Sequence, residues 1–238
     1  KTCHDRPSLR STVHPRQERV EPEVLARWKE KQEELAARVI TTLVHHELTH
    51  VAGVDCAFAG DASVAVAVLW DVASQDVVRV RSVRRKVTVP YRTGFLSFRE
   101  GPAVHEVLDR LGPFDAAIFD GQGLAHPRRC GLATHVGVER DIVAVGCAKS
   151  RLVGTYVDPP NQTGMVTDLH HRDDVVGRVV RTREGTKPVF VSGGHRCDLD
   201  QATAIVRATR TRYRLPEPTR LADKLVAKAK LGEVVDTG

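Results

Sequence analysis

The stretch FDGQGLAHPRR, residues 119–129, decides how the rest of the chain is organised. A short apolar run over residues 115–120 ends in Asp120, and two glycines, a histidine and an arginine pair follow directly. A carboxylate at the end of a buried strand can hold a metal ion, glycines let backbone approach a ligand closely, and arginines meet phosphates. The same residues also fit a strand followed by a basic surface turn, so this stretch alone leaves both interpretations open.

The flanking residues predict an α/β fold. A helix over residues 131–138 and an apolar strand over residues 142–146 follow the quoted stretch, and the order strand, helix, strand implies a parallel pair with a right-handed crossover. Further strands are expected as an antiparallel meander over residues 50–58, 63–71 and 77–89, and then over residues 153–157, 175–181 and 188–192, around a polar loop at 158–174. Helices are expected over residues 23–42, 99–111, 199–212 and 219–230. The pattern predicts a mixed central sheet, an antiparallel meander plus parallel strands, with helices on both faces.

Composition bounds the class of protein. The 238 residues are 41% hydrophobic and 28% charged, which predicts one folded domain over residues 21–231. A mobile basic tail, residues 1–20, should precede it, and a C-terminal tail, residues 232–238, should follow it. The net charge of +6 favours a polyanionic partner such as nucleic acid. The five cysteines form no CxxC pair and no apolar run approaches the length of a membrane span, so we expect a cytoplasmic protein, monomeric and without membrane contact.

Acidic residues fall where the predicted elements converge. Asp55 lies in the first strand, Asp120 ends the first parallel strand, and Glu100 is in the first turn of the helix between them. Carboxylate oxygens suit Mg²⁺ or Mn²⁺, and a metal held there would activate water for phosphodiester cleavage. Each acid alone is more often a solvated carboxylate or a helix cap. Asp55 is the exception, because an unpaired charge inside the apolar run GVDCAF would be costly.

A second motif competes for Asp55. His46 and His50 enclose HExxH, with Glu47 between them, and the pattern continues to Gly53 and Asp55 as HExxHxxGxxD, which resembles the zinc site of metzincin proteases. That site needs both histidines on one helical face, Glu47 as general base and Asp55 as third ligand. The residues after His50 predict a strand instead, and the single methionine of the chain lies in a polar loop rather than a Met-turn. A zinc protease is therefore kept only as a remote alternative.

Longer blocks of sequence resemble the endonuclease V family, the deoxyinosine-directed DNA repair endonucleases. They occur in the family's order between about residue 23 and residue 230: GVDCAF, PYRTGFLSFREGP, FDGQGLAHPRRCGLATHVG, VGCAKSRLVGT, FVSGGHR and YRLPEPTRLAD. The resemblance implies a ribonuclease H-like fold and Mg²⁺-dependent hydrolysis, with Mn²⁺ as a substitute, of the second phosphodiester bond 3′ to inosine. It implies 3′-hydroxyl and 5′-phosphate products. DNA is the favoured substrate, and an inosine-specific endoribonuclease is the alternative.

The resemblance also implies roles for individual residues. The family's metal centre corresponds to Asp55, Glu100, Asp120 and His195. Lys149 matches the lysine placed near the scissile or adjacent phosphate. The damaged base is read in a pocket formed largely by backbone, which corresponds to Gly94, Phe95, Leu96, Gly121, Leu132 and Gly146. Hypoxanthine presents an O6 acceptor and an N1 donor, which fixed backbone groups can read once the base is flipped out.

Contacts around the base follow from the same resemblance. Tyr91 matches the aromatic of the family's strand-separating wedge, PYIP in many bacterial members, which reads PYRT here and so loses its second proline. His126, Arg128 and Arg129 are expected to contact the strand near the base. The block YRLPEPTRLAD is expected to be structural, with its prolines setting how the last helix docks.

Overall fold

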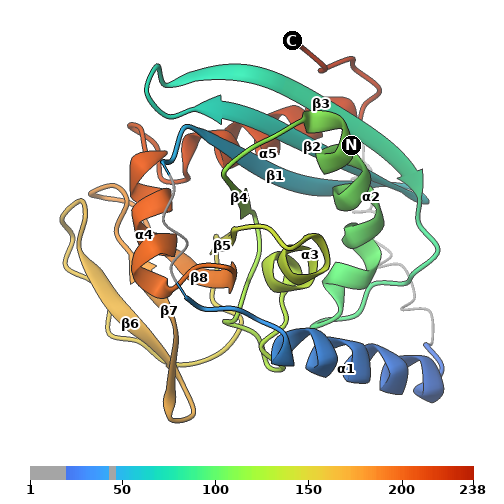
Figure 1. Cartoon of the computed structure of the whole chain (residues 1–238), viewed down its shortest axis with the longest axis horizontal. Coiled ribbons are helices and arrows are strands. Elements are labelled where there is room, and N and C mark those ends of the chain that lie inside the picture. The colour runs from blue at the N-terminus through green and yellow to red at the C-terminus, as the bar shows by residue number, and fades with distance from the viewer. Residues whose placement is uncertain (1–19, 43–46) are drawn as a thin grey trace, which may run out of the picture.

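Eight strands form one mixed sheet in the residues that the computed structural model describes, 20–42 and 47–238 (Figure 1). The strands are β1 His50–Ala59, β2 Ala62–Asp71, β3 Asp76–Lys86, β4 Ala116–Phe119, β5 Ala144–Ala148, β6 Val166–His171, β7 Asp174–Val180 and β8 Val189–His195. The helices are α1 Pro22–Ala37, α2 Leu96–Leu111, α3 Leu132–Arg140, α4 Leu199–Ala208 and α5 Glu217–Ala229. Residues 1–19 of the predicted N-terminal tail, and His46 of the HExxH motif, lie outside the described residues.

The centre of the sheet is parallel and its two sides are antiparallel. The strand order is β3-β2-β1-β4-β5-β8-β7-β6. β1, β4 and β5 are parallel neighbours, β1 to β3 form the predicted meander, and β8, β7 and β6 extend the other side. All four residues of β4 are buried, as expected for a strand with helices on both faces. The predicted α/β fold with a mixed sheet is therefore confirmed.

Alternate residues of the central strands face two separate cores. Ala52 packs with α2 and α3 on one face of the sheet, whereas Val51 and Ile118 pack with α4 on the other face. Helix α5 covers β1 and β2 on the same side as α4. Because side chains alternate along a strand, Asp55 and Asp120 continue the second set and rise on the face that α4 and α5 cover.

Three helices have bounds that differ from the prediction by three residues or more. α4 ends at Ala208 rather than at residue 212. α1 ends at Ala37 rather than at residue 42, because residues 39–42 are all β-branched and favour helix poorly. α2 begins at Leu96, so Glu100 lies in its second turn rather than its first. Within residues 20–42 and 47–238, no helix is long and apolar enough to cross a membrane.

The strands on the far side of the sheet are the least well predicted. Residues 153–157 form no strand, and Thr155 makes only an isolated bridge with His170. β6 instead lies inside the predicted polar loop at 158–174. It is an edge strand with one buried residue, Leu169, so its sequence carries almost no apolar alternation.

The predicted C-terminal tail packs on the domain. Thr237 exchanges both backbone hydrogen bonds with Val80 of β3, at 3.0 and 3.1 Å. Arg81 donates to the Thr237 carbonyl at 2.8 Å, and Ser82 donates to Asp236 at 2.5 Å. The last residues therefore cover part of the outer edge of β3, which would otherwise present unpaired backbone groups.

Candidate active site

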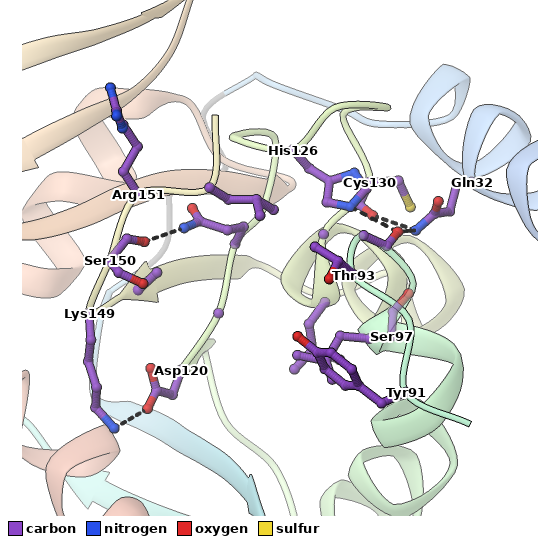
Figure 2. Close-up of a pocket in the computed structure, with 18 residues that line it drawn as sticks. Gln32, Tyr91, Thr93, Ser97, Asp120, His126, Cys130, Lys149, Ser150 and Arg151 are labelled. Carbon is purple, nitrogen blue, oxygen red and sulfur yellow. Dashed lines mark hydrogen bonds and ion pairs between the residues drawn. The ribbon is translucent and has the colours of Figure 1, made fainter. Parts of the chain in front are cut away.

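A pocket of about 380 Å³ opens beside the carboxyl ends of β4 and β5 (Figure 2). The residues predicted to contact the base that line it are Tyr91, Gly94, Leu96, Gly121, His126 and Leu132. Asp120 and Lys149, two of the predicted catalytic residues, line the same pocket. The structure therefore brings the predicted base pocket and part of the predicted catalytic group to one opening.

Two predicted pocket residues lie behind its wall instead. The Phe95 ring packs against Trp28, at 5.7 Å between ring centres, and the Arg128 guanidinium lies 4.3 Å from the centre of the Phe95 ring. Gly146 is on β5, where a Cβ atom would come within 2.4 Å of the Gly123 nitrogen. Gly146 thus lets the loop after β4 lie directly on β5, so both residues shape the pocket from behind.

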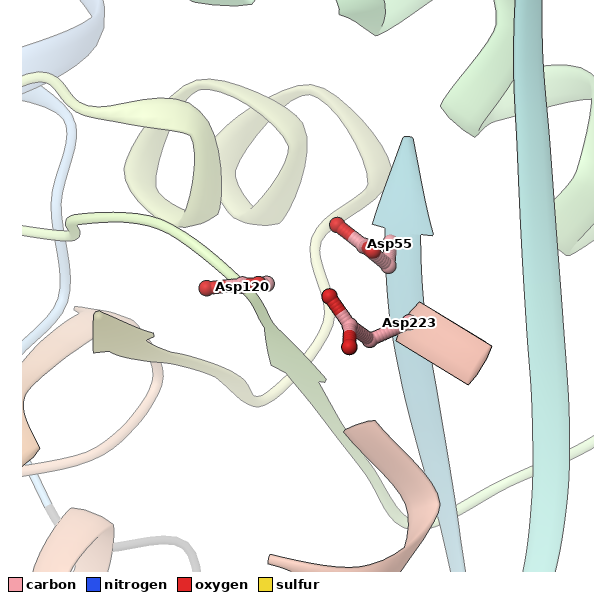
Figure 3. A group of neighbouring side chains, drawn as sticks. All are labelled: Asp55, Asp120 and Asp223. Carbon is pink, nitrogen blue, oxygen red and sulfur yellow. The ribbon is translucent and has the colours of Figure 1, made fainter. Parts of the chain in front are cut away.

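Three aspartates meet at the edge of this pocket (Figure 3). Asp55 comes from β1, Asp120 follows β4, and Asp223 comes from α5, with one carboxylate oxygen of each within 4.8 Å of the others. The first two are neighbours because β1 and β4 are parallel, and the Asp120 amide donates to the Val54 carbonyl at 3.0 Å. The predicted convergence of Asp55 and Asp120 therefore follows directly from strand pairing.

A glycine in β1 brings the third aspartate to the cluster. A Cβ atom on Gly53 would lie 2.1 Å from the carbonyl carbon of Pro218, in the first turn of α5. The missing side chain lets the start of α5 lie directly on β1, and the helix then passes over β1 and β2. Asp223 lies less than two turns further along α5, which places it over Asp55.

Burial and mutual repulsion raise the pKa values of the carboxyl groups in and beside the acidic cluster. Burial, and then the Asp120 carboxylate, raise the pKa of Asp55 to about 7. Glu100 of α2 is 6% exposed, and burial, followed by the charges of Asp55 and Asp120, raises its pKa to about 8. Burial also raises the pKa of Asp120, although a hydrogen bond from Lys149 opposes that rise. Crowded carboxylates with raised pKa values fit a bound divalent cation, which favours their ionised forms.

Lys149 is a cation placed among these carboxylates. It follows β5, and its Nζ lies 2.5 Å from Asp120 Oδ2 and 2.5 Å from Asp223 Oδ1. Burial alone would lower the pKa of Lys149, but the two hydrogen bonds outweigh burial and raise it. The lysine is therefore charged and bridges two of the three aspartates.

His195 lies away from the acidic cluster. It ends β8 and pairs with Ala144, the first residue of β5, whereas Lys149 directly follows the last residue of β5. The length of β5 separates these two ends by roughly 13 Å at the usual rise per residue. His195 is therefore at the opposite end of the central strands from Asp120, and the expectation that it shares a metal ion with Asp55 and Asp120 is wrong for this structure.

The ring of His195 has protein partners at that opposite end of the strands. Its Nδ1 accepts from the Ile40 amide at 3.3 Å, and its Nε2 lies 3.0 Å from Asp141 Oδ1. Arg196 donates to both oxygens of Asp141 at 2.6 Å. The histidine thus joins the segment after α1 to the turn after α3, which is a structural role.

The protease-like motif does not form a zinc site in the described residues. Residues 47–49 are not helical, and β1 begins at His50. His50 and Asp55 are five residues apart on this strand, so their side chains leave opposite faces about 16 Å apart. His50 Nε2 instead lies 3.6 Å from Asp71 Oδ2. Gly53 is inside the strand rather than at a turn, so the geometry that the motif needs is absent from these residues.

The basic residues after Asp120 bind protein groups. His126 Nε2 lies 3.1 Å from the Gly94 carbonyl oxygen, and Arg128 Nη2 donates to the same oxygen at 2.6 Å. Arg129 Nη2 donates to Asp174 at 2.7 Å, on the β6–β7 hairpin. These side chains are predicted to contact the nucleic-acid strand. In this structure His126 and Arg128 bind the pocket wall at Gly94, and Arg129 binds the β6–β7 hairpin.

Sequence reasoning missed Asp223 in the cluster. It lies in the block YRLPEPTRLAD, whose prolines suggested a structural role, and an aspartate on an amphipathic helix is usually solvated. The available signal was its position beside the apolar residues Ala222 and Val226, which face the sheet. That signal indicates only a boundary position on the helix, not a ligand.

A mixed sheet with acidic residues gathered at the carboxyl ends of its central strands, beside a ligand-sized pocket, defines a nuclease with a ribonuclease H-like fold. The endonuclease V family model matches residues 33–224. The chain therefore belongs to the endonuclease V family of DNA repair endonucleases. This confirms the resemblance found in the sequence and shows that the zinc protease alternative is wrong.

Individual relatives match over nearly the whole chain. Endonuclease V of Roseiflexus sp. (strain RS-1) is 46% identical over 212 residues, which are 88% of this chain and 95% of that protein. The crystal structure of endonuclease V from Streptomyces avermitilis is 41% identical with a TM-score of 0.82, and the match covers 92% of this chain and 97% of that one. Endonuclease V of Ciona intestinalis, in complex with a 24mer DNA containing an inosine followed by a ribo-adenosine, is 27% identical with a TM-score of 0.76, covering 88% and 99%.

Proposed function

We propose that the protein nicks nucleic acid that contains inosine, by hydrolysis of the second phosphodiester bond 3′ to the lesion, with 3′-hydroxyl and 5′-phosphate products. The observation that carries this proposal is the adjacency of Asp120, in the acidic cluster, and Gly121, in the pocket wall. A base held in the pocket would keep its own strand next to the carboxylates. The inosine in the DNA bound by the Ciona relative supports this choice of base.

We assign Mg²⁺ to the acidic cluster, with Mn²⁺ as a substitute. Asp55, Asp120 and Asp223 offer three carboxylate oxygens within 4.8 Å, and hard oxygen donors suit these cations. Glu100 belongs to the same centre, because the charges of Asp55 and Asp120 act on it directly. When bound, such a cation makes water more acidic and stabilises the leaving oxygen. The protein's part is to hold four acidic groups close together in a partly buried site, where their repulsion favours cation binding.

Lys149 supports the reaction from the other side of the cluster. Its ammonium lies 2.5 Å from both Asp120 and Asp223, so it keeps these two carboxylates at a fixed spacing. A phosphate that enters the centre would compete for the same donor, since an ammonium group has three N–H bonds to share. We assign Lys149 to the phosphate at or next to the scissile bond, where it offsets developing negative charge.

The pocket wall suits recognition of a flipped base. Gly94, Gly121 and Leu132 line it, and the two glycines carry no side chain that would keep a base away from the backbone. Fixed N–H and C=O groups can distinguish the O6 acceptor and N1 donor of hypoxanthine from the reverse pattern of adenine. Tyr91 is 50% exposed at the mouth of the pocket, where its ring can stack against the bases next to the position that the flipped inosine has left. A wobble pair also costs less to open than a matched pair.

One gel assay tests the proposal. Inosine-containing DNA and RNA of identical sequence are incubated with the protein in Mg²⁺, Ca²⁺ or chelator, and products are sized beside markers. We expect a Mg²⁺-dependent nick one nucleotide beyond the inosine, and no nick in the strand with adenine in its place. Tight binding without a Mg²⁺-dependent nick would instead define an inosine-binding module.

RNA remains the second candidate substrate. The wedge reads PYRT rather than PYIP, and the DNA in the Ciona complex carries a ribo-adenosine after its inosine. A faster nick in the RNA strand of the same assay would identify an inosine-specific endoribonuclease. We also propose a monomer, because one chain supplies the pocket and the acidic cluster together. We propose that it acts in the cytoplasm, since its cysteines form no CxxC pair and are odd in number.

A further inference from the structure

The wedge loop, defined here as residues 89–95, is held by hydrogen bonds at both of its ends. At one end, Arg99 Nη1 donates to the Val89 carbonyl at 3.0 Å. At the other end, the Gly94 carbonyl accepts hydrogen bonds from three side chains. Tyr91 projects between these two anchors at the mouth of the pocket. The position of the Tyr91 ring therefore depends on how firmly the two ends are held.

Three donors converge on the Gly94 carbonyl. They are Arg128 Nη2 at 2.6 Å, Gln32 Nε2 at 3.0 Å and His126 Nε2 at 3.1 Å. Burial, and then the Arg128 charge, lower the pKa of His126 to about 4, so its ring is neutral at pH 7. Its Nδ1 accepts from the Arg128 amide at 3.3 Å, which leaves the proton on Nε2 to donate to Gly94. Gly94 itself has φ of +78°, a conformation that favours glycine.

Gln32 connects both walls of the pocket from helix α1. It is fully buried, and only it and Leu35 are buried among the residues of that helix. Its Oε1 accepts from Arg128 Nε at 2.6 Å, and its Nε2 donates to the carbonyls of Gly94, on the wedge loop, and of Cys130, on the loop after β4, the second at 3.1 Å. Figure 2 shows Gln32 and His126 directed at the same oxygen. One amide thus ties the wedge loop to the facing wall.

We propose that Gln32 is a positioning residue for strand separation, which holds the Tyr91-bearing wedge loop at a fixed height over the pocket. The proposal rests on the proposed function, because a wedge needs a duplex to open. A wedge must resist the two strands that it parts, and a second proline would supply stiffness by fixing φ. This chain has Thr93 at that position, and the hydrogen bonds on Gly94 supply the restraint instead.

Gln32→Met tests the proposal with little change in side-chain volume. The variant leaves the carbonyls of Gly94 and Cys130, and Arg128 Nε, each without one partner. Nicking is measured on inosine in a duplex and in the single strand of the same sequence, both in Mg²⁺. We expect the ratio of duplex to single-strand kcat/KM to fall roughly fivefold to tenfold, the effect of the one hydrogen bond lost to the wedge loop. Single strands need no wedge and should be nicked nearly as before.

A second readout avoids catalysis. With 2-aminopurine beside the inosine and Ca²⁺ in place of Mg²⁺, binding of the wild-type protein should raise the fluorescence of the unstacked base. The rise should be smaller for Gln32→Met at saturating protein. Gln32→Glu still accepts the hydrogen bond from Arg128 but no longer donates to the Gly94 carbonyl. The fluorescence rise should therefore also be smaller for this variant, in which Arg128 keeps its partner.

Leu35→Ala is the matched control. Leu35 is fully buried on the same helix, and its truncation weakens the packing of α1 without removing a bond to Gly94. We expect a lower melting temperature and an unchanged duplex to single-strand ratio. A wild-type ratio in both Gln32 variants, or an equal fall in Leu35→Ala, would overturn the positioning role. A wild-type protein that nicks neither strand would overturn the proposed function instead.

Discussion

Replacing Asp55 with asparagine should stabilise the metal-free protein at pH 8 and remove its response to Mg²⁺. Asp55 is ionised at that pH, in a buried site beside Asp120 and Asp223, and Lys149 is the cation whose charge offsets it. Asparagine has nearly the same shape and carries no charge. The variant therefore separates what the carboxylate costs the fold from what it contributes to ion binding.

The magnitude follows from the pKa of Asp55. Burial first, and the Asp120 charge second, raise this pKa from 3.8 to about 7. The folded state therefore holds the proton more tightly than the unfolded state, so stability is lost as pH rises from 3.8 to about 7. At about 1.4 kcal/mol for each unit, the total loss is about 4 kcal/mol, of which about 3 kcal/mol develops between pH 5 and pH 8. Loss of Asp55 also relieves Glu100, whose pKa the Asp55 charge raises.

Thermal unfolding by circular dichroism measures this effect. In chelator, the difference in melting temperature between Asp55→Asn and wild type should grow by roughly 6 to 12 °C between pH 5 and pH 8, for a chain of this size. Mg²⁺ should raise the melting temperature of wild type at pH 8 by mass action, and should have little effect on the variant. The reasoning fails if the difference is the same at both pH values, or if Mg²⁺ stabilises both proteins equally.

Four further substitutions test separate parts of the site. Asp120→Ala should abolish nicking of an inosine duplex in Mg²⁺ while much of the binding remains in a gel shift, and unchanged nicking would remove Asp120 from the reaction. Tyr91→Ala should weaken nicking of duplex more than of single strands, and equal losses on both would argue against a wedge. Gly53→Ala should lower the free energy of unfolding by about 3 kcal/mol, because its Cβ meets the backbone of α5 at 2.1 Å, and a wild-type urea midpoint would contradict that contact. His195→Gln should keep Mg²⁺-dependent nicking, because the His195 ring lies at the end of the central strands away from Asp120. A variant that folds but does not nick would show that His195 belongs to the metal centre.

The parallel centre of the fold was predictable from local pattern. The runs that became β1 and β4 are strongly apolar, each carries or precedes an aspartate, and a helix between β4 and β5 requires a parallel pairing. The edge strand β6 was not predictable, because a strand with one buried residue has no apolar alternation to recognise. Residues 153–157 are the reverse case, because a β-like run predicted as a strand makes only the isolated bridge between Thr155 and His170.

The sequence by itself determined that Asp55 lies within an apolar strand, that Asp120 ends another, and that the strands flanking α3 are parallel. The parallel pairing of β1 with β4, which brings the two aspartates side by side, joins segments far apart in the chain and was decided by tertiary packing. Only the tertiary structure decided which group joins them. His195 ends β8, which runs antiparallel to β5, so it lies at the end of the strands opposite to Asp120, whereas Asp223 reaches the cluster because α5 lies directly on Gly53. The direction of a distant strand and the closeness of a helix are set by packing across the whole domain, and no local pattern of residues encodes them.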